Sequence, residues 1–498
     1  MDTLYQEYTN HLKKIADLNA AIAVLSWDKE VNLPKKSAAF RSQQVATLSG
    51  MVHEMSTDKK FVRLLEDIDE EALSFDQKRN ISQTKRSLEK SLKFDTAFVI
   101  EKSKVVSECF HAWLKARENN DHKLFLDPLN KLIDKVREEA EILSYDDHPY
   151  DAMLDLYEQN LKVADLESLF NPLKEELAQL LSKIKSADQV EDQFLKQYFD
   201  KDKQWDFGLY ILRSMGYDFD YGRQDISTHP FTISFSPQDV RVTTRIDEQD
   251  FLNMTWSCIH EGGHALYEQG LPSESYGLPL GNSISLGIHE SQSRLWENNV
   301  GRSLNFWKYQ YPKLQSFFPE QLNHISLEKF YKGINRIESN LIRTEADEIH
   351  YHLHVIIRYE IEKALMEGAL QVHDIKDAWN AKYQSYMGLT PPDDNTGFLQ
   401  DIHWSHGSIG YFPTYSIGSL YAAQFFAQIR KEHSGLRDQI AQGDTSTVLT
   451  WLREHIHAHG QRYSAADLCK QLTGEVLNAQ YFIDYLKTKY AEIYNIAL

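Results

Sequence analysis

Helix-period patterning constrains the fold of this chain more than any other feature. Apolar residues recur every three or four positions, as on one face of a helix, almost everywhere outside residues 220–250 and 268–288. Glycine and proline, which interrupt helices, number only 22 and 13 among 498 residues. The sequence therefore predicts a mainly α protein with long helices, such as those from Tyr5 to Trp27 and from Leu161 to Ser186.

The length of the chain predicts more than one hydrophobic core. Single cores seldom grow beyond about 250–300 residues, so 498 residues favour two packed lobes with a central groove. No linker-like or repetitive stretch separates the halves, and we expect one functional unit over residues 1–498. The approximate lobes are a helical one over residues 1–215 and a second one over residues 216–498, where the candidate metal ligands lie.

One short region departs from the helical pattern. Between Phe231 and Ile246, apolar residues occupy alternate positions on either side of a turn-forming sequence, Ser236-Pro237-Gln238-Asp239. This pattern predicts a small β-hairpin beside the helix that carries the metal motif. An edge strand there could bind an extended peptide by pairing with it as an additional strand.

The sequence His260-Glu261-Gly262-Gly263-His264 is the strongest chemical signal in the chain. It lies in a predicted helix that approaches from Phe251 and stops at Gly270, so the two histidines share one face at positions i and i+4. That spacing lets both imidazoles bind one metal ion, and Glu261 can act as base and then acid toward a metal-activated water. Two glycines inside a helix are unfavourable, which predicts a close approach of another backbone or of a substrate.

A catalytic zinc site usually has three protein ligands and one open position. The best candidate for the third ligand is Glu290, which follows His264 by 26 residues. The loop between them, residues 270–287, is rich in glycine, proline and serine and can return the chain into an antiparallel helix. As alternatives, Glu290 faces solvent or pairs with Arg294 at i+4. His289 is a weaker ligand candidate and is expected to pack or form hydrogen bonds near the site.

Six short motifs follow one another along the sequence, and together they resemble those of the M32 metallocarboxypeptidases over most of the chain. They are His229-Pro230-Phe231, Asp239-Val240-Arg241-Val242-Thr243, the HExxH sequence at 260–264, His289-Glu290-Ser291-Gln292, Ile342-Arg343-Thr344-Glu345-Ala346-Asp347 and Gly397-Phe398-Leu399-Gln400-Asp401-Ile402-His403-Trp404.

The resemblance implies a zinc- or cobalt-dependent exopeptidase that removes single residues from the C-termini of short peptides with broad specificity. It also implies one divalent metal ion per chain and a homodimer. Matching the motifs makes His260, His264 and Glu290 the metal ligands and Glu261 the general base and acid.

A carboxypeptidase must also bind the terminal carboxylate of its substrate, and guanidinium groups suit this task because they pair bidentately with carboxylates. Arg343 and Arg241 lie in the motifs and are the leading candidates. As an alternative, both arginines form ion pairs within the protein, Arg343 with Asp347 at i+4. His229 and Gln400 are further motif residues that we include among the candidate substrate contacts.

The reaction also requires a donor for the oxyanion that forms at the substrate carbonyl. Tyr411 and Tyr415 follow the last motif closely and offer phenol hydroxyls, and His403 within it offers an imidazole. Tyrosines are abundant, with 26 in the chain, so packing is the alternative role for each of them.

Two other sets of residues are assigned structural roles. His350, His352 and His354 alternate in a predicted helix from about Asn340 to Gly368, without the accompanying carboxylates of a second metal site. Cys258 lies two residues before His260 and is expected to be a small buried apolar residue.

Composition excludes several classes of partner. The net charge of −19, from 54 basic and 73 acidic residues, argues against nucleic acid. No run of about 18 apolar residues predicts a membrane helix. The first seven residues, Met1 to Glu7, lack the basic and apolar parts of a secretion signal, and three scattered cysteines do not make a disulfide framework. We therefore expect a cytoplasmic enzyme that acts on peptides.

Two rival functions remain at this stage. A metallo-oligopeptidase of the helical HExxH type would cut inside peptides and would need an open-ended groove without a carboxylate clamp. A non-catalytic helical protein with a structural metal is disfavoured, because Glu261 is present and structural zinc sites usually have four protein ligands. Amidation of a substrate's C-terminus separates the first two functions, since only an exopeptidase depends on the free carboxylate.

Overall fold

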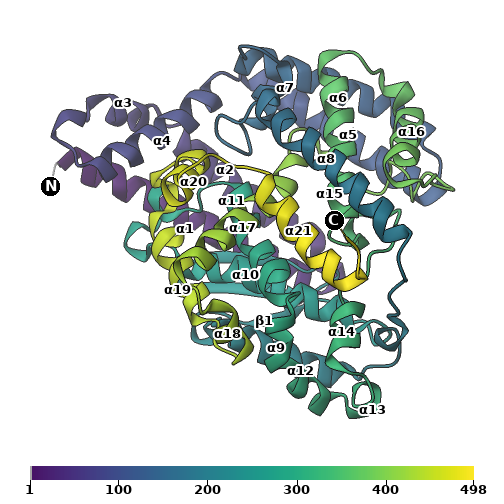
Figure 1. Ribbon diagram of the computed structural model, residues 1–498. Helices are drawn as coiled ribbons and strands as arrows, with labels where there is room; N and C mark the ends of the chain where they lie inside the picture. Colours follow the sequence, from purple (N-terminus) through teal and green to yellow (C-terminus); the bar gives the residue numbers. More distant parts are fainter. Residues whose placement is uncertain (1–2, 498) are drawn as a thin grey trace. The chain divides into compact units, whose positions relative to one another are not determined.

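The computed structural model describes residues 3–497 and confirms a mainly α protein with one small three-stranded sheet (Figure 1). The chain forms two compact units, each built from three separate stretches of sequence. Unit 1 comprises Met1–Ser91, Glu191–Ile334 and Phe425–Val476, and unit 2 comprises Leu92–Val190, Asn335–Gln424 and Leu477–Leu498. The sequence predicted two lobes that meet at a single boundary near residue 215. It could not predict units made of separate stretches, because local periodicity does not reveal which distant helices pack together.

Unit 1 contains the sheet and thirteen of the α-helices of the described chain. Its helices are α1 (Thr3–Val31), α2 (Ala38–Ser56), α3 (Lys59–Asp67), α4 (Phe75–Leu92, whose last residue falls in unit 2), α9 (Lys201–Met215), α10 (Phe251–Gly270), α11 (Leu286–Arg294), α12 (Leu304–Phe317), α13 (Pro319–Leu322), α14 (Leu327–Gly333), α18 (Leu436–Ala441), α19 (Ser446–His455) and α20 (Ala465–Thr473). The predicted helix from Tyr5 to Trp27 lies within α1.

The described residues of unit 2 form helices joined by turns and loops, without a strand. Its helices are α5 (Thr96–Asn119), α6 (Lys123–Leu143), α7 (Pro149–Leu154), α8 (Val163–Lys185), α15 (His350–Glu367), α16 (Ile375–Met387) and α21 (Gln480–Tyr494), and α17 (Pro413–Glu432) begins in this unit. The predicted helix from Leu161 to Ser186 corresponds to α8.

The sheet has the strand order β1-β3-β2. Strands β2 (Thr232–Ser236) and β3 (Asp239–Thr244) pair antiparallel, which confirms the predicted hairpin. Strand β1 (Gln224–Ile226) pairs parallel to β3 and was not predicted, because three residues are too few to show alternation. Helix α10 packs against β2 and β3, so the sheet lies beside the helix that bears the metal motif, as expected (Figure 1).

Helix α10 has the predicted extent, from Phe251 to Gly270. The side chain of Asp250 accepts a hydrogen bond from the backbone N–H of Leu252 and caps its start. Helix α11 begins after Ser285, whose hydroxyl caps the N–H of Ile288, and continues into a π-helical segment, η7 (Leu295–Gly301). Segments with this wider winding are often found at functional sites.

Helices α10 and α11 are antiparallel neighbours, as the loop length predicted. Contacts between them advance along α10 while they retreat along α11 and η7, from His260 with Glu297, through His264 with Glu290, to Glu268 with His289. The metal motif and the third ligand candidate therefore face each other across this helix pair.

The prediction of one helix from Asn340 to Gly368 was wrong in its first ten residues. Helix α15 begins only at His350, and a short 3-10 turn, η8 (Arg343–Glu345), precedes it. The carboxylate of Asp347 accepts hydrogen bonds from the backbone N–H groups of Ile349 and His350, which starts the helix at this point.

Among residues 3–497, no helix is both long and apolar enough to cross a membrane. The three cysteines, Cys109, Cys258 and Cys469, are all free and buried.

Candidate metal centre

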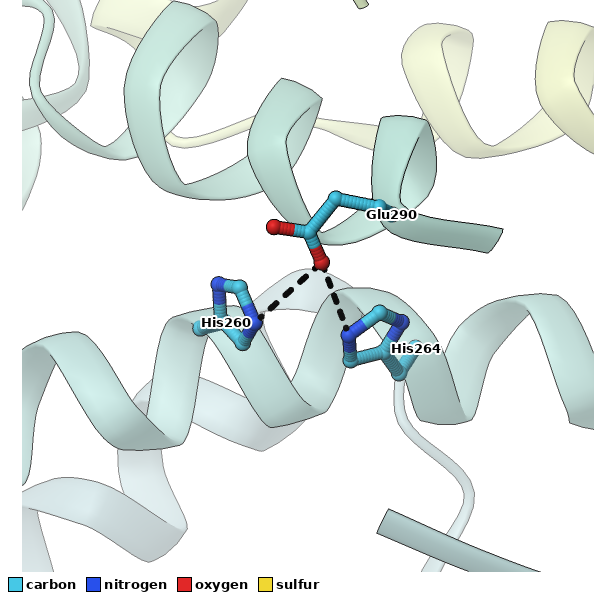
Figure 2. Close-up of side chains that lie close together, drawn as sticks. All are labelled: His260, His264 and Glu290. Carbon is cyan, nitrogen blue, oxygen red and sulfur yellow. Dashed lines mark ion pairs between the residues drawn. The ribbon is translucent and has the colours of Figure 1, made fainter. Parts of the chain in front are cut away.

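Two histidines on α10 and a glutamate on α11 bring three potential ligand atoms together (Figure 2). Glu290 Oε2 lies 3.7 Å from His260 Nε2 and 3.4 Å from His264 Nε2. Atoms that bind one zinc ion at about 2.0–2.1 Å in tetrahedral geometry stand about 3.3 Å apart. The three residues that the sequence singled out therefore form a cluster whose donor atoms and spacing fit one divalent metal ion.

Side chains behind the cluster leave the appropriate ligand atoms available. His260 Nδ1 lies 2.8 Å from Glu297 Oε2 and carries the proton of that hydrogen bond, so Nε2 is the nitrogen left to bind a metal. Arg294 Nε donates to Glu290 Oε1 at 2.7 Å, while Oε2 points at the histidines. Glu290 therefore pairs with Arg294 through Oε1, as the alternative held, and this pairing is compatible with metal binding through Oε2.

Glu297 joins several positive groups behind His260. Its carboxylate accepts from Arg294 Nη1 at 3.0 Å and from Arg302 Nη2 at 3.4 Å, and the Arg302 guanidinium stacks on Trp256 at 4.0 Å from the ring centroid. Burial alone would raise the pKa of Glu297 and of Glu290, but Arg294 and the neighbouring imidazoles hold both pKa values well below their usual range. Both carboxylates are therefore ionised at neutral pH.

The two histidines of the cluster differ in their electrostatic surroundings. Burial lowers the pKa of His264, and the neighbouring His289 lowers it further. Burial also opposes protonation of His260, but the charges of Glu290 and Glu297 raise its pKa overall. His264 is thus already in the neutral form that binds a metal, whereas a bound cation would compete with a proton at His260.

The Glu261 side chain contacts the sheet through Thr232 on β2. Its side chain is buried, and the hydroxyl of Thr232 on β2 lies 2.7 Å from Glu261 Oε2 and 2.9 Å from the Glu261 backbone carbonyl oxygen. A hydroxyl has one proton to donate, so it serves one of these oxygens at a time. Strand β2 therefore holds one oxygen of the candidate base and fixes the orientation of the other.

The two glycines of the motif have different neighbours. A Cβ atom at Gly263 would stand 2.7 Å from the Cα of Ser293 and 2.8 Å from the carbonyl oxygen of Gln292, both in the backbone of α11. A Cβ atom at Gly262 would instead meet the end of the Leu212 side chain, at 2.8 Å. Gly263 therefore confirms the predicted close approach of another backbone, and it sets the distance between the two helices.

Arg241 and His229 lie in unit 1 with the metal cluster but have contacts of their own. The Arg241 guanidinium pairs bidentately with Asp239 at 2.9 Å through each nitrogen and stacks on Trp27 at 4.4 Å. The His229 side chain is exposed, and its backbone carbonyl oxygen accepts a hydrogen bond from Ser227 at 2.6 Å.

Arg343 in unit 2 forms an ion pair within the protein, as the alternative reading held, but its partner is Asp401 and not Asp347. Its Nε and Nη2 atoms donate to Asp401 Oδ1 at 3.0 and 2.8 Å, and Arg358 binds the other oxygen of Asp401 at 2.6 Å. The alternative pair with Asp347 at i+4 does not form, because Arg343 lies in a 3-10 turn before the helix and Asp347 binds His350 instead. Burial alone would raise the pKa of Asp401, but the two arginines hold it far below its usual range.

The remaining candidates from the last motif surround Arg343. Gln400 is fully engaged, because its oxygen accepts from the backbone N–H of Arg343 and its amide nitrogen donates to backbone carbonyls, including that of Leu341. His403 Nε2 lies 3.1 Å from the Tyr415 hydroxyl, and the Tyr415 ring lies 4.9 Å from the Arg343 guanidinium. The Tyr411 ring contacts those of His403 and Tyr415. Burial and the charge of Arg343 lower the pKa of His403 to about 3, so it is neutral.

The residues assigned structural roles have such roles. His350, His352 and His354 are buried and form hydrogen bonds with Asp347, Ser416 and Tyr383 respectively. Cys258 is buried, and burial raises the pKa of its thiol to about 12.

Sequence reasoning missed Thr232 and Glu297. Glu297 follows Glu290 by seven residues, two turns along a helix, and this spacing is a usable signal for a residue that supports the same site. Thr232 has no such signal, since it meets Glu261 only through the packing of β2 on α10.

Comparison with known proteins adds independent evidence. The family described as carboxypeptidase Taq (M32) metallopeptidase matches residues 7–490. "Carboxypeptidase 1" of Bacillus subtilis is 39% identical over 495 residues, and "Thermostable carboxypeptidase 1" of Thermus thermophilus is 38% identical over 508 residues, each match covering 99% of both chains. The crystal structure of an M32 carboxypeptidase from Deinococcus radiodurans superposes with a TM-score of 0.97 at 37% identity, covering 99% of this chain and 100% of that one.

Proposed function

Since the chain belongs to the carboxypeptidase Taq (M32) family of metallopeptidases and is a metallocarboxypeptidase, we propose that His260, His264 and Glu290 bind its divalent metal ion and that Glu261 is its general base. The observation that carries this proposal is the convergence of three ligand atoms within 4.8 Å of one another, with Glu261 next to the first of them in the sequence.

The chemistry assigned to Glu261 follows from its position. A bound divalent cation lowers the pKa of a water molecule and polarises the substrate carbonyl. Glu261 takes a proton from the attacking water and later delivers it to the nitrogen of the departing amino acid. Thr232 donates to Oε2 of Glu261, which leaves Oε1 as the oxygen for this proton transfer. The burial of Glu261 limits competition from bulk water.

We propose zinc as the metal, with cobalt as the alternative. Two imidazoles and one carboxylate form the ligand set of many catalytic zinc sites, which keep one position open for water or substrate. Cobalt accepts the same nitrogen and oxygen ligands. Residues 3–497 contain a second group of close ligand atoms, Asp121, His122 and Asp394, but only the cluster of His260, His264 and Glu290 has two imidazoles, which supports one catalytic ion per chain.

For the substrate, we propose short peptides with a free C-terminal carboxylate and broad side-chain specificity. Arg241 and Arg343 are the proposed partners of that carboxylate, although each already pairs with an aspartate. Substrate binding at either would therefore add to, or replace, an existing ion pair. Tyr411, Tyr415 and His403 are the proposed oxyanion donors, supported by their clustering around Arg343, while His229 and Gln400 are proposed to shape the substrate site.

We also propose that the enzyme is a homodimer of the reducing cytoplasm. The cytoplasmic location is supported by three buried, unpaired cysteines, since secreted proteins usually oxidise theirs. The dimer rests on the resemblance to the family and is tested by light scattering of the purified protein.

The test is to incubate the metal-loaded enzyme with one short peptide carrying either a free or an amidated C-terminus and to follow released amino acids by mass spectrometry. We expect sequential release from the free C-terminus only, and loss of at least about 10²-fold in Glu261→Gln. Glu274→Gln, an exposed glutamate of the same unit, is the matched control. Internal cleavage of both peptides would instead identify an oligopeptidase, and full activity of Glu261→Gln would remove Glu261 from the mechanism.

A further inference from the structure

His264 is supported by His289, the weaker ligand candidate, and by Glu268, and neither belongs to the cluster of three ligand atoms. His264 Nδ1 lies 2.7 Å from His289 Nδ1, and His289 Nε2 lies 2.8 Å from Glu268 Oε1. The two imidazole rings are close, with centroids 4.5 Å apart. Glu268, His289 and His264 thus form a continuous hydrogen-bonded row, in that order. The row ends at His264 Nε2, which faces Glu290.

We propose that Glu268 and His289 are positioning residues, which together fix the ring orientation and the tautomer of His264 for metal binding. This inference rests on the proposed role of His264 as a ligand. His289 accepts a hydrogen bond from His264, and Glu268 keeps His289 in the tautomer that can accept it.

The direction of the hydrogen bonds follows from proton counting. A histidine that binds a metal through Nε2 carries its only proton on Nδ1. His264 Nδ1–H must then donate, and His289 Nδ1 must accept. A neutral His289 carries its remaining proton on Nε2, which donates to the carboxylate of Glu268. Only this arrangement satisfies all three side chains while leaving the Nε2 lone pair of His264 available.

The positions of these residues on the helices explain why the row exists. His260, His264 and Glu268 follow one another at intervals of four, so they share one face of α10. His289 precedes the ligand Glu290 on the facing helix α11. The same pair of helices therefore supplies both the ligands and the row behind one of them.

The two histidine ligands are supported differently. Behind His260 stands the carboxylate of Glu297 itself, which also pairs with arginines. Behind His264 stands an imidazole, and the carboxylate of Glu268 is one residue further away. Groups that hydrogen-bond to ligating histidines typically contribute about 10- to 100-fold to metal affinity. The structure assigns a contribution of this size to His289.

The experiment measures Zn²⁺ affinity of the full-length apoprotein by competition with a chromophoric chelator, and therefore does not depend on activity. His289→Phe keeps a ring but removes the acceptor, and Glu268→Leu removes the acceptor for His289. We expect both to weaken Zn²⁺ binding by about 10- to 100-fold. Glu268→Gln retains an accepting oxygen and should stay within about threefold of the wild type. Glu274→Leu, at an exposed position of the same unit, is the matched control.

Thermal unfolding of each apoprotein shows whether a variant is folded, and Glu268→Leu provides a second test if His289→Phe unfolds. Wild-type affinity in both variants, or equal losses in Glu268→Gln and Glu268→Leu, would overturn the inference. His264→Ala separates this failure from failure of the metal site itself. If His264→Ala binds Zn²⁺ as tightly as the wild type, the proposed ligand set is wrong. If it loses binding while His289→Phe does not, only the positioning role is wrong.

Discussion

Gly263→Ala is the smallest change that should separate the two halves of the metal site. The added methyl group would lie 2.7 Å from Ser293 Cα, whereas ordinary contact begins at 3.4 Å, so the two helices must move apart by about 0.7 Å (3.4 minus 2.7). The obstacle is backbone, which cannot rotate away as a side chain can. Helix α11 carries Glu290, and the histidine ligands are on α10, so the displacement acts directly on the spacing of the ligand atoms.

Two energies oppose each other in this substitution. Replacing glycine by alanine inside a helix favours the helix by about 1 kcal/mol, while overpacking a close contact costs about 1–3 kcal/mol. The net loss in the free energy of unfolding is then at most about 2 kcal/mol. Metal–ligand distances in well-formed sites agree with their ideal values to about 0.2 Å, so a displacement of about 0.7 Å should lower Zn²⁺ affinity much more clearly, by about tenfold or more.

Zn²⁺ affinity from chelator competition and the free energy of unfolding from urea titration measure the two effects separately. The matched control is Gly262→Ala, where the methyl group meets the ends of Leu212 and Met215, side chains that can move. We expect Gly262→Ala to bind Zn²⁺ within about twofold of the wild type. If Gly263→Ala binds Zn²⁺ as well as this control does, the helix spacing does not determine the metal site and the reasoning fails.

Three further outcomes are expected. Thr232→Val should lower kcat by about 10- to 100-fold with little change in KM, because Glu261 loses its hydroxyl partner; Thr232→Ser should restore most of kcat, and an unchanged kcat in the valine variant would exclude a positioning role. Asp401→Asn should lower the free energy of unfolding at pH 7 by about 3–5 kcal/mol, because it leaves buried Arg343 and Arg358 uncompensated. The pKa of Asp401 is lower in the folded than in the unfolded state, so the ionised carboxylate stabilises the fold above the ordinary pKa of 3.8 and this stabilisation is lost as pH falls. In urea titrations from pH 7 downward, the difference in the free energy of unfolding between the wild type and Asp401→Asn should become smaller, and a constant difference would contradict this assignment. Removal of the metal with a chelator should abolish peptide hydrolysis and lower Tm by calorimetry, since an ion at 100 times its Kd stabilises the fold by about 2.7 kcal/mol; an unchanged Tm would show that no ion binds preferentially to the folded state.

The sequence predicted those features that depend on local spacing. The extent of α10 followed from apolar periodicity and from the stop at Gly270, and the hairpin followed from alternation. The approach of a second backbone at Gly263 followed from the cost of glycine in a helix. Each of these signals lies within about twenty residues of the feature that it predicts.

Features that depend on packing between distant segments were not predicted. Asp401 rather than Asp347 became the partner of Arg343, because a turn replaced the expected helix and a residue 58 positions away supplied the charge. Thr232 reaches Glu261 only because β2 packs on α10, and neither residue's neighbours in the sequence indicate this contact. Strand β1 depends on its pairing with β3 and has no pattern of its own.

The division of each unit among three stretches of sequence bears on how the protein is made. Domains usually fold as units, with the amino-terminal one first, while synthesis proceeds. Here the core of unit 1 needs Phe425–Val476, and unit 2 still needs the stretch that begins at Leu477. The stretch that begins at Phe425 follows Ser91 by 334 positions, so unit 1 is not complete until that stretch has been synthesised. Completion of either unit requires a nearly finished polypeptide, and long-range closure of this kind slows folding.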